Sequence, residues 1–259
     1  MLRVERLDAH HGLLHAVRTV SLQVADGETL ALVGANGAGK TTLLRTIAGG
    51  HRVSSGRVLF DGADVSSLPA HRRVRLGITL VPEGRRLFPE MTVEENLLVA
   101  RRAGEWTLGR VYETFPMLRA LRKKRAATLS GGEQQAAAIA RALMTNPRLL
   151  LVDEASLGLA PVAVERVYES LEAVVGSGTT VVLVEQDLGR ALGVASRVAC
   201  MLEGRIVLEG AAGEITREQV VEAYFGLRRR SGVGSTEPPS SGGAGSAGAG
   251  AETGKAAVP

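Results

Sequence analysis

A stretch near the amino terminus has the composition of a phosphate-binding loop. It follows the pattern G-x-x-x-x-G-K-[ST] and reads Gly34, Ala35, Asn36, Gly37, Ala38, Gly39, Lys40, Thr41, with Thr42 next. Glycine lets the backbone turn successive N–H groups toward phosphate oxygens, and a following helix would point its positive end at the same place. Lys40 would neutralise the β- and γ-phosphates, while the Thr41 hydroxyl would bind Mg²⁺. These residues predict a site for ATP or GTP.

Two carboxylates follow an apolar run further along the chain. Leu149–Val152 has the composition of a buried strand, and Asp153 and Glu154 come directly after it. Open α/β sheets bind ligands at the carboxyl ends of their strands. Asp153 is therefore a candidate Mg²⁺ ligand, and Glu154 is a candidate general base for the water that attacks a phosphate. A strand that merely ends in a charged turn is the alternative, and the phosphate loop upstream favours hydrolysis.

A third group of candidate residues opens a helix. Ser130 and Glu133 have the spacing of a capping box, in which each side chain bonds the backbone N–H of the other residue. Capping does not account for Gly131 and Gly132, since glycine in a helix costs about 1 kcal/mol relative to alanine. Glycines are expected here if a group must approach the backbone closely, and a phosphate at a helix amino terminus is such a group. The two roles are compatible.

Alternating strands and helices are predicted to position these residues. The expected strands are Leu2–Leu7, Val17–Val24, Thr29–Val33, Leu149–Val152, Thr180–Val184 and the strand-like run Val198–Leu202. The expected helices are Lys40–Ala48, Glu94–Arg102, Leu108–Glu113, Gly132–Leu143 and Val162–Val175. This alternation predicts an α/β fold with a mainly parallel sheet and helices on both faces. Because no convincing strand lies between residues 93 and 145, that part is predicted to be a helical insertion.

Composition excludes several classes of protein. The 259 residues carry a net charge of +4 and are 45% hydrophobic but only 3% aromatic, which favours a core of aliphatic side chains. The single cysteine, Cys200, cannot form an internal disulfide. No leader sequence is expected, and no apolar run approaches the roughly 18 residues of a membrane helix. Basic runs interleaved with aromatic residues are missing, so no nucleic acid is expected as a partner.

The chain is predicted to divide near residue 228. Residues 1–228 hold the alternating elements and include a helical subdomain at about 90–146. Residues 229–259 are dominated by Gly, Ser, Ala, Pro and Thr, and such a segment cannot bury enough apolar surface to offset the entropy lost on ordering. This segment is predicted to be a disordered tail.

Taken together, the three groups of residues resemble those of an ATP-binding cassette (ABC) ATPase. The resemblance covers about residues 1–226 and rests on the phosphate loop, Leu129–Gln135 and Leu149–Glu154, in this order and with a helical stretch before the second. It implies a P-loop NTPase fold with a mainly parallel sheet core, an antiparallel β edge and an inserted helical subdomain. It also implies ATP and Mg²⁺ as ligands and two cassettes that face head to tail. In such a pair, Ser130, Gly131 and Gly132 contact the ATP held by the partner's phosphate loop.

A finer resemblance is to the second ATPase subunit of branched-chain amino-acid importers. It rests on Val81–Phe88, Met91–Leu97, Ser156–Pro161, Leu183–Gln186 and Ala223–Gly226. In that subgroup, glutamate at position 83 and glutamine at position 186 are common, and both occur here. Glu83 stands where a glutamine of the wider family usually contacts the metal or the attacking water. Gln186 stands where a histidine usually bonds the γ-phosphate. Because glutamine cannot become a cation as histidine can, a functional but slower site is expected.

Two more positions depart from the family pattern. His11 stands where a tyrosine usually stacks under adenine. Imidazole can stack with a smaller area, and a plain surface histidine is the alternative. Ala155 replaces a proline that commonly follows the catalytic glutamate, a change expected to loosen the backbone and to spare the chemistry.

The resemblance also implies partners and a location. The partners are a second ABC ATPase subunit (a paralogue or a second copy), two membrane permeases and, indirectly, a solute-binding protein. The chain would then be a peripheral subunit on the cytoplasmic face of the membrane, with Arg86 and Phe88 near a permease. The alternatives are an importer of urea or short amides, a non-transport cassette acting on nucleic acid or ribosomes, and a phosphotransferase. The single cassette disfavours the second of these, and Leu129–Gln135, for which a kinase has no use, disfavours the third.

Overall fold

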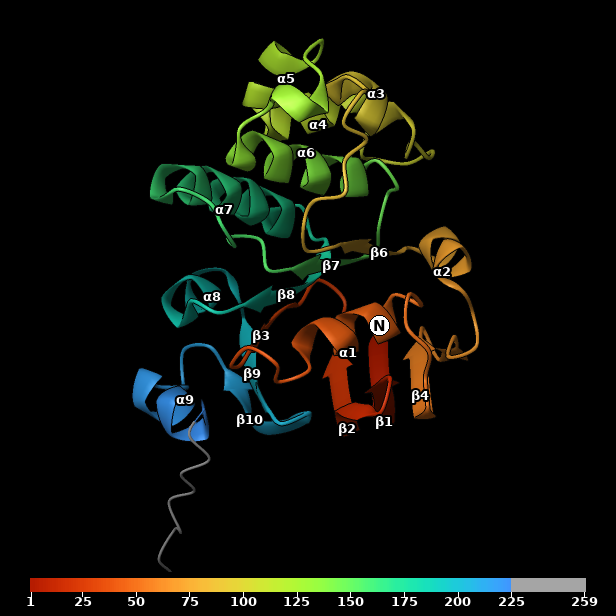
Figure 1. Cartoon of the computed structure of the whole chain (residues 1–259), viewed down its shortest axis with the longest axis vertical. Helices are drawn as coiled ribbons and strands as arrows, with labels where there is room; N and C mark the ends of the chain where they lie inside the picture. Colours follow the sequence, from red (N-terminus) through yellow and green to blue (C-terminus); the bar gives the residue numbers. More distant parts are fainter. Residues whose placement is uncertain (225–259) are drawn as a thin grey trace, which may run out of the picture. The chain divides into compact units, whose positions relative to one another are not determined.

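Six strands form the central sheet of this computed structural model, which describes residues 1–224 (Figure 1). They lie in the order β10-β9-β3-β8-β7-β6. Their bounds are β3 (Thr29–Val33), β6 (Ile78–Val81), β7 (Leu149–Asp153), β8 (Thr180–Glu185), β9 (Arg197–Leu202) and β10 (Arg205–Ala211). Five of the six are parallel, and β10 is antiparallel to β9. Every residue of β3, β7 and β8 is buried, which explains their almost continuous apolar sequences and confirms the mainly parallel sheet.

A second, antiparallel sheet has the strand order β2-β1-β4-β5 and confirms the antiparallel β edge. Its strands are β1 (Leu2–His11), β2 (Leu14–Val24), β4 (Ser55–Phe60) and β5 (Ala63–Asp64). β1 and β2 are longer than the apolar pattern predicts, because they continue as a hairpin up to the turn at residues 12–13. Helix α1 (Lys40–Ile47) contacts both sheets and buries Leu43, Leu44 and Ile47 in one shared hydrophobic cluster (Figure 1). This packing holds α1 firmly behind the phosphate loop.

Helices fill the chain between β6 and β7, at the top of Figure 1. They are α3 (Val93–Leu98), α4 (Leu108–Thr114), α5 (Pro116–Leu121) and α6 (Gly131–Leu143), with a 3-10 turn at Ala126–Thr128. The helix expected over Glu94–Arg102 ends four residues early, since the Arg102 N–H bonds the Met144 carbonyl at 2.9 Å instead of continuing the helix. Helix α5 has no counterpart among the predicted helices. The boundaries of a separate helical subdomain stay a prediction.

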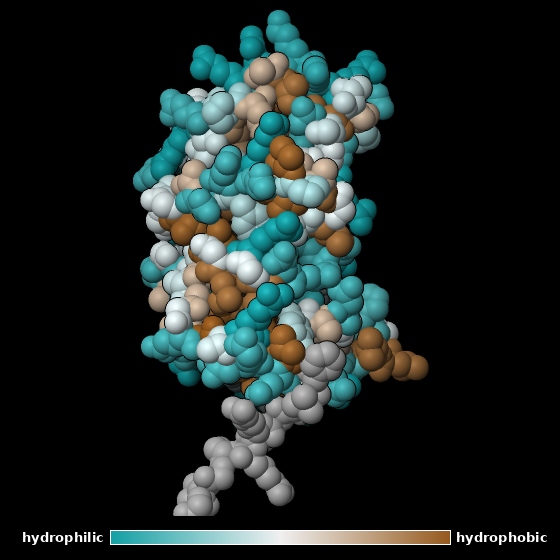
Figure 2. Space-filling view, turned by 90° about the vertical axis from the view of Figure 1, so that its left-hand side faces the viewer, coloured by the Kyte–Doolittle hydropathy of each residue, from teal (hydrophilic) through white to brown (hydrophobic). Residues whose placement is uncertain are grey.

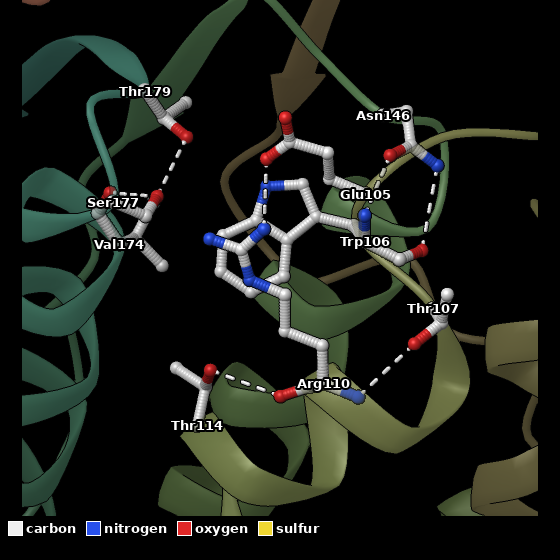
Figure 3. Close-up of polar contacts among 9 residues, drawn as sticks. All are labelled: Glu105, Trp106, Thr107, Arg110, Thr114, Asn146, Val174, Ser177 and Thr179. Atoms are coloured by element: carbon white, nitrogen blue, oxygen red, sulfur yellow. Dashed lines mark hydrogen bonds and ion pairs between the residues drawn. The ribbon is translucent and has the colours of Figure 1, made fainter.

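A buried tryptophan fixes the point where the helices rejoin the sheet. Trp106 is 5% exposed, and the Arg110 guanidinium lies 4.6 Å above the centre of its ring. The Asn146 side chain accepts a hydrogen bond from the Trp106 N–H at 2.7 Å and donates one to the Trp106 carbonyl at 3.4 Å (Figure 3). Gly104 makes room for this contact, because a Cβ there would lie 2.4 Å from the Asn146 amide. The start of β7, three residues after Asn146, is thereby held in place.

The remaining helices lie on two sides of the central sheet (Figure 1). Helices α7 (Pro161–Gly176), α8 (Leu188–Val194) and α9 (Arg217–Tyr224) cover one side, and α2 (Ala70–Leu76) lies on the other. The surface over α7 to α9 is mostly hydrophilic, with apolar side chains in small groups (Figure 2). Within residues 1–224, no helix is long and apolar enough to cross a membrane. Cys200 is buried, and the predicted tail at 229–259 lies outside the described residues.

Candidate nucleotide-binding site

A cleft of about 240 Å³ lies where β3 and β7 end. It is lined by His11, Leu14, Ala16, Asn36, Gly37, Gly39, Lys40, Thr41, Thr42, Arg45 and Glu154. The fold therefore brings the predicted phosphate loop (residues 34–41) together with a carboxylate that is far away in sequence. Both groups reach the cleft because β3 and β7 are parallel strands of one sheet, so their carboxyl ends point the same way.

Two glycines of the phosphate loop are required by close packing. Gly39 has φ +101°, and a Cβ there would lie 2.1 Å from the Ala16 carbonyl oxygen. A Cβ on Gly34 would lie 2.3 Å from the Met201 carbonyl oxygen. The loop can therefore fold closely against β2 and β9 only with glycine at both positions. Among residues 1–224, no side chain caps the amino end of α1, and that end is open to an anion.

Lys40 is folded back onto the loop that precedes it. The residue is 4% exposed, and its ammonium donates to the carbonyls of Gly34 at 2.7 Å and Ala35 at 3.0 Å. Burial lowers the pKa of Lys40, and the charges of Glu154 and Asp153 oppose that shift. The ammonium can exchange its two carbonyl partners for phosphate oxygens while its stem stays in place.

Asp153 presents a buried oxygen that lacks a partner. The residue is fully buried, its Oδ1 accepts a hydrogen bond from the Thr41 hydroxyl at 3.0 Å, and its Oδ2 has no hydrogen-bond partner among the described residues. Burial raises the pKa of Asp153, and the hydrogen bond from Thr41 opposes that rise. A buried carboxylate oxygen without a partner is unfavourable unless a ligand satisfies it. Because Mg²⁺ prefers carboxylate and hydroxyl oxygens, Thr41 and Asp153 fit that ion.

Glu154 and Gln186 meet at the ends of two neighbouring strands. Glu154 follows β7 and Gln186 follows β8, which are parallel neighbours in the sheet. The Gln186 amide donates to Oε1 of Glu154 at 3.0 Å. Glu154 also has φ +52°, a conformation that costs a non-glycine residue about 1–3 kcal/mol and that is often found at functional sites. The fold thus pairs the predicted base with the predicted γ-phosphate ligand.

Glu83 lies in the loop after β6, the strand next to β7. Its side chain is exposed. Burial of Asp153 is the main cause that raises the pKa of Asp153, and the negative charge of Glu83 adds a smaller contribution in the same direction. The same loop contains Arg85 and Arg86, which have φ +63° and +50°. The Arg85 guanidinium donates to the Gln134 side chain on α6 at 3.1 Å. The loop therefore connects the neighbourhood of Asp153 with the helix that begins after Ser130.

The predicted Ser130–Gly132 group lies at the start of α6, outside the residues that line the cleft. The capping box is present, since the Ser130 N–H donates to Glu133 Oε2 at 2.7 Å and the Glu133 N–H donates to Ser130 Oγ at 3.4 Å. A Cβ on Gly132 would lie 2.6 Å from the Cβ of Ala163 on α7. Close packing of α6 on α7 is therefore one reason for the glycine at position 132. This reason is additional to the close approach of a phosphate, which the sequence predicts.

His11 and Leu14 flank the turn of the β1–β2 hairpin, and both line the cleft. The His11 ring stacks on His51 with their centres 6.1 Å apart. Leu14 is 61% exposed and offers an apolar surface of the kind that base-binding sites use. The sequence motifs missed Leu14, Ala16 and Arg45. Strand alternation was the available signal for the first two, because alternate residues of a strand share a face.

A mainly parallel sheet that gathers a glycine loop, a lysine and strand-end carboxylates around one cleft defines the P-loop NTPase class. The family model described as ABC transporter matches residues 17–157. Three relatives that are described as branched-chain amino acid transport ATP-binding proteins match 86–87% of the chain. BraG of Pseudomonas aeruginosa, a high-affinity branched-chain amino acid transport ATP-binding protein, is 42% identical over 87% of the chain and 100% of its own length. BraF of the same organism, with the same description, is 30% identical over 87% and 98%. A probable branched-chain amino acid transport ATP-binding protein of Archaeoglobus fulgidus, LivF, is 35% identical over 86% and 97%.

Solved structures show the same fold. A nucleotide-free ATP-binding cassette from an ABC transporter has a TM-score of 0.74 and 27% identity, over 87% of the chain and 95% of that structure. The dimeric structure of MJ0796, a bacterial ABC transporter cassette, has a TM-score of 0.71 and 25% identity, over 82% and 99%. The chain belongs to the ABC transporter family, and it is an ATP-binding and ATP-hydrolysing subunit of that family.

Proposed function

We propose that the chain is the ATPase subunit of an importer for branched-chain amino acids and that it works on the cytoplasmic face of the membrane. The observation that carries this proposal is the 42% identity with BraG over the whole length of that relative. Identity with BraF of the same organism is lower, at 30%. The chain therefore corresponds to the BraG position in such an importer, and a BraF-like paralogue is the expected second ATPase.

Binding of ATP uses the phosphate loop and the hairpin beside it. Lys40 exchanges its bonds to the loop carbonyls for bonds to β- and γ-phosphate oxygens, and the N–H groups at the start of α1 surround the same phosphates. His11 and Leu14 provide the surface for the adenine ring, since both line the cleft at the hairpin. Thr42 and Arg45, on α1, complete the lining of the cleft.

Hydrolysis uses the residues at the ends of β6, β7 and β8. Thr41 and Asp153 would hold Mg²⁺, with Glu83 as a further carboxylate, and the ion would neutralise charge on the phosphate oxygens when bound. Glu154 accepts a proton from the attacking water as general base. Gln186 orients the Glu154 carboxylate through its amide and donates to the γ-phosphate.

A second cassette supplies the rest of each site. The dimer of the MJ0796 cassette supports such a pair. The capped start of α6 presents the backbone N–H groups of Gly131 and Gly132 together with the Ser130 hydroxyl. Because these residues lie outside the cleft of their own chain, we assign them to the ATP held by the partner's phosphate loop.

The surface around Phe88 is proposed to bind one of two membrane permeases. The solute-binding protein would contact the permeases and not this chain. Phe88 is a large apolar side chain that is 49% exposed, and its backbone is bonded by the Asn96 side chain of α3. Leu98, at the end of α3, and Val99, directly after it, are also exposed, at 40% and 57%. The Arg141 guanidinium lies 5.7 Å from the centre of the Phe88 ring. Arg86 belongs to the same loop as Glu83, so a permease that moves this loop also moves a group near the metal site.

The test is amino-acid uptake by cells that lack the gene for this chain. Uptake of radiolabelled leucine, isoleucine and valine is expected to fall, and to return with the wild-type chain but not with Lys40→Ala. Immunoblotting shows whether both chains are present at equal amounts. Unchanged leucine uptake together with lost urea uptake would contradict the proposed cargo and would favour the urea or amide importer.

A further inference from the structure

A buried carboxylate beside the cleft has no role in the chemistry described above. Glu185 is the last residue of β8 and is 2% exposed. Within residues 1–224 it forms no ion pair, it accepts hydrogen bonds from three backbone N–H groups, and the Tyr168 hydroxyl interacts with it besides. A carboxylate buried without a cation is unfavourable unless hydrogen bonds compensate for the lost water. The positions of these N–H groups therefore show which backbone segments Glu185 holds together.

The N–H groups belong to two separate segments. Oε1 of Glu185 accepts from the Ser156 N–H at 3.2 Å. Oε2 accepts from the Gln186 N–H at 3.0 Å and from the Asp187 N–H at 3.4 Å. Ser156 stands two residues after Glu154, and the Gln186 side chain donates to Glu154 at 3.0 Å. One buried carboxylate thus ties together the two segments that carry the Glu154–Gln186 pair.

The surroundings make the charge of Glu185 matter. Hydrogen bonds to an ionised acceptor are roughly twice as strong as neutral ones. The Tyr168 hydroxyl, on α7, is buried nearby, and burial followed by the Glu185 charge raises the pKa of Tyr168. Asp187 is itself fixed, because its Oδ1 accepts from the Arg190 N–H and caps α8. Glu185 is therefore a rigid anchor between α8 and the turn after Glu154.

We propose that Glu185 is a positioning residue for ATP hydrolysis, which holds Ser156 and Gln186–Asp187 at the separation at which Gln186 bonds Glu154. The proposal rests on hydrolysis at this cleft, as set out under the proposed function. Glu185 does not line the cleft and bonds no residue of the phosphate loop. It acts on turnover through Glu154 and Gln186 and leaves the binding of ATP unchanged.

The test is the variant Glu185→Gln in the full chain. Glutamine keeps the size of the side chain, but in either orientation its –NH₂ group faces a backbone N–H group. The kcat for Mg²⁺-ATP is expected to fall about tenfold or more, while the Kd for a fluorescent ATP analogue stays within about twofold of wild type. The control is Glu172→Gln, an exposed carboxylate on α7, which is expected to keep both wild-type values.

A double variant shows whether Glu185 acts through Gln186. In a Gln186→Ala background, Glu185→Gln is expected to lower kcat by less than about a third of its effect in the wild type. Equal effects in both backgrounds, an unchanged kcat, or parallel losses of kcat and ATP affinity would each overturn the positioning role. If the wild-type chain fails to hydrolyse ATP even when it is assembled with its second cassette, the proposed function fails instead. Should Glu185→Gln not fold, Glu185→Asp, which retracts the charge by one methylene, takes its place with the same expected results.

Discussion

Replacing Arg73 by methionine is expected to destabilise the fold by about 3–5 kcal/mol. Arg73, on α2, is 1% exposed and donates from its guanidinium to four backbone carbonyls: Thr46 (2.8 Å), Ile47 (2.8 Å), Ser66 (2.8 Å) and Leu68 (2.9 Å). Two of these carbonyls end α1, the helix that follows the phosphate loop. Four hydrogen bonds from a charged donor, at about 1.5 kcal/mol each, amount to roughly 6 kcal/mol. Burial lowers the pKa of Arg73, which shows that the charge itself is unfavourable there, and removing it returns part of that sum.

Urea unfolding and thermal melting measure this effect. For a domain of this size, each kcal/mol shifts Tm by about 2–4 °C, so Arg73→Met is expected to lower Tm by roughly 6–20 °C. The matched control is Arg72→Met on the same helix, because Arg72 is exposed. That change is expected to stay within about 0.5 kcal/mol of wild type. If the two variants have stabilities within about 1 kcal/mol of each other, the four hydrogen bonds do not hold α1 as argued.

Three further predictions concern the cleft and the start of α6. Asp153→Asn is expected to abolish Mg²⁺-dependent hydrolysis yet raise Tm, because it removes a buried charge with an unpartnered oxygen. Burial raises the pKa of Asp153 in the folded state above its value in the unfolded chain. The free energy of unfolding of the wild type should therefore fall, relative to that of Asp153→Asn, as the pH rises between those two pKa values. Urea unfolding at a series of pH values measures this difference. Gly132→Ala is expected to destabilise the fold by about 1–3 kcal/mol through its clash with Ala163, and Ala163→Gly is expected to restore most of that loss in melting experiments. Gln186→His is expected to speed single-turnover hydrolysis in the assembled transporter, and an unchanged rate would refute the argument that a neutral amide slows this site.

The sequence predicts most reliably those elements whose residues are all buried. β3, β7 and β8 are recognised within a residue or two because parallel strands covered on both faces are almost continuous apolar runs. The phosphate loop and the capping box at Ser130 are predicted because local backbone requirements dictate their residue types. β10 escapes notice because it alternates between half-buried and exposed residues at the sheet edge, and β4 because half of it is exposed.

The parts of the site that depend on distant contacts could not be predicted. Glu185 lies within the motif Leu183–Gln186, but the sequence gives it no role, because strand pairing brings its distant partner Ser156 to it. The close approach of Ala163 to Gly132 likewise depends on how α7 packs on α6. The family resemblance assigns separate roles to Glu154 and Gln186, and the hydrogen bond between them follows from the pairing of β7 with β8.

Phosphate release from Mg²⁺-ATP by the full chain, compared between wild type and Glu154→Gln, decides whether this cleft hydrolyses ATP as described. Glutamine keeps the shape of the side chain but cannot accept a proton from the attacking water. The variant is expected to bind ATP with a Kd within about twofold of wild type and to turn over about 10²–10⁴-fold more slowly. A variant that releases phosphate at the wild-type rate would show that Glu154 is not the general base and would contradict the mechanism at this site.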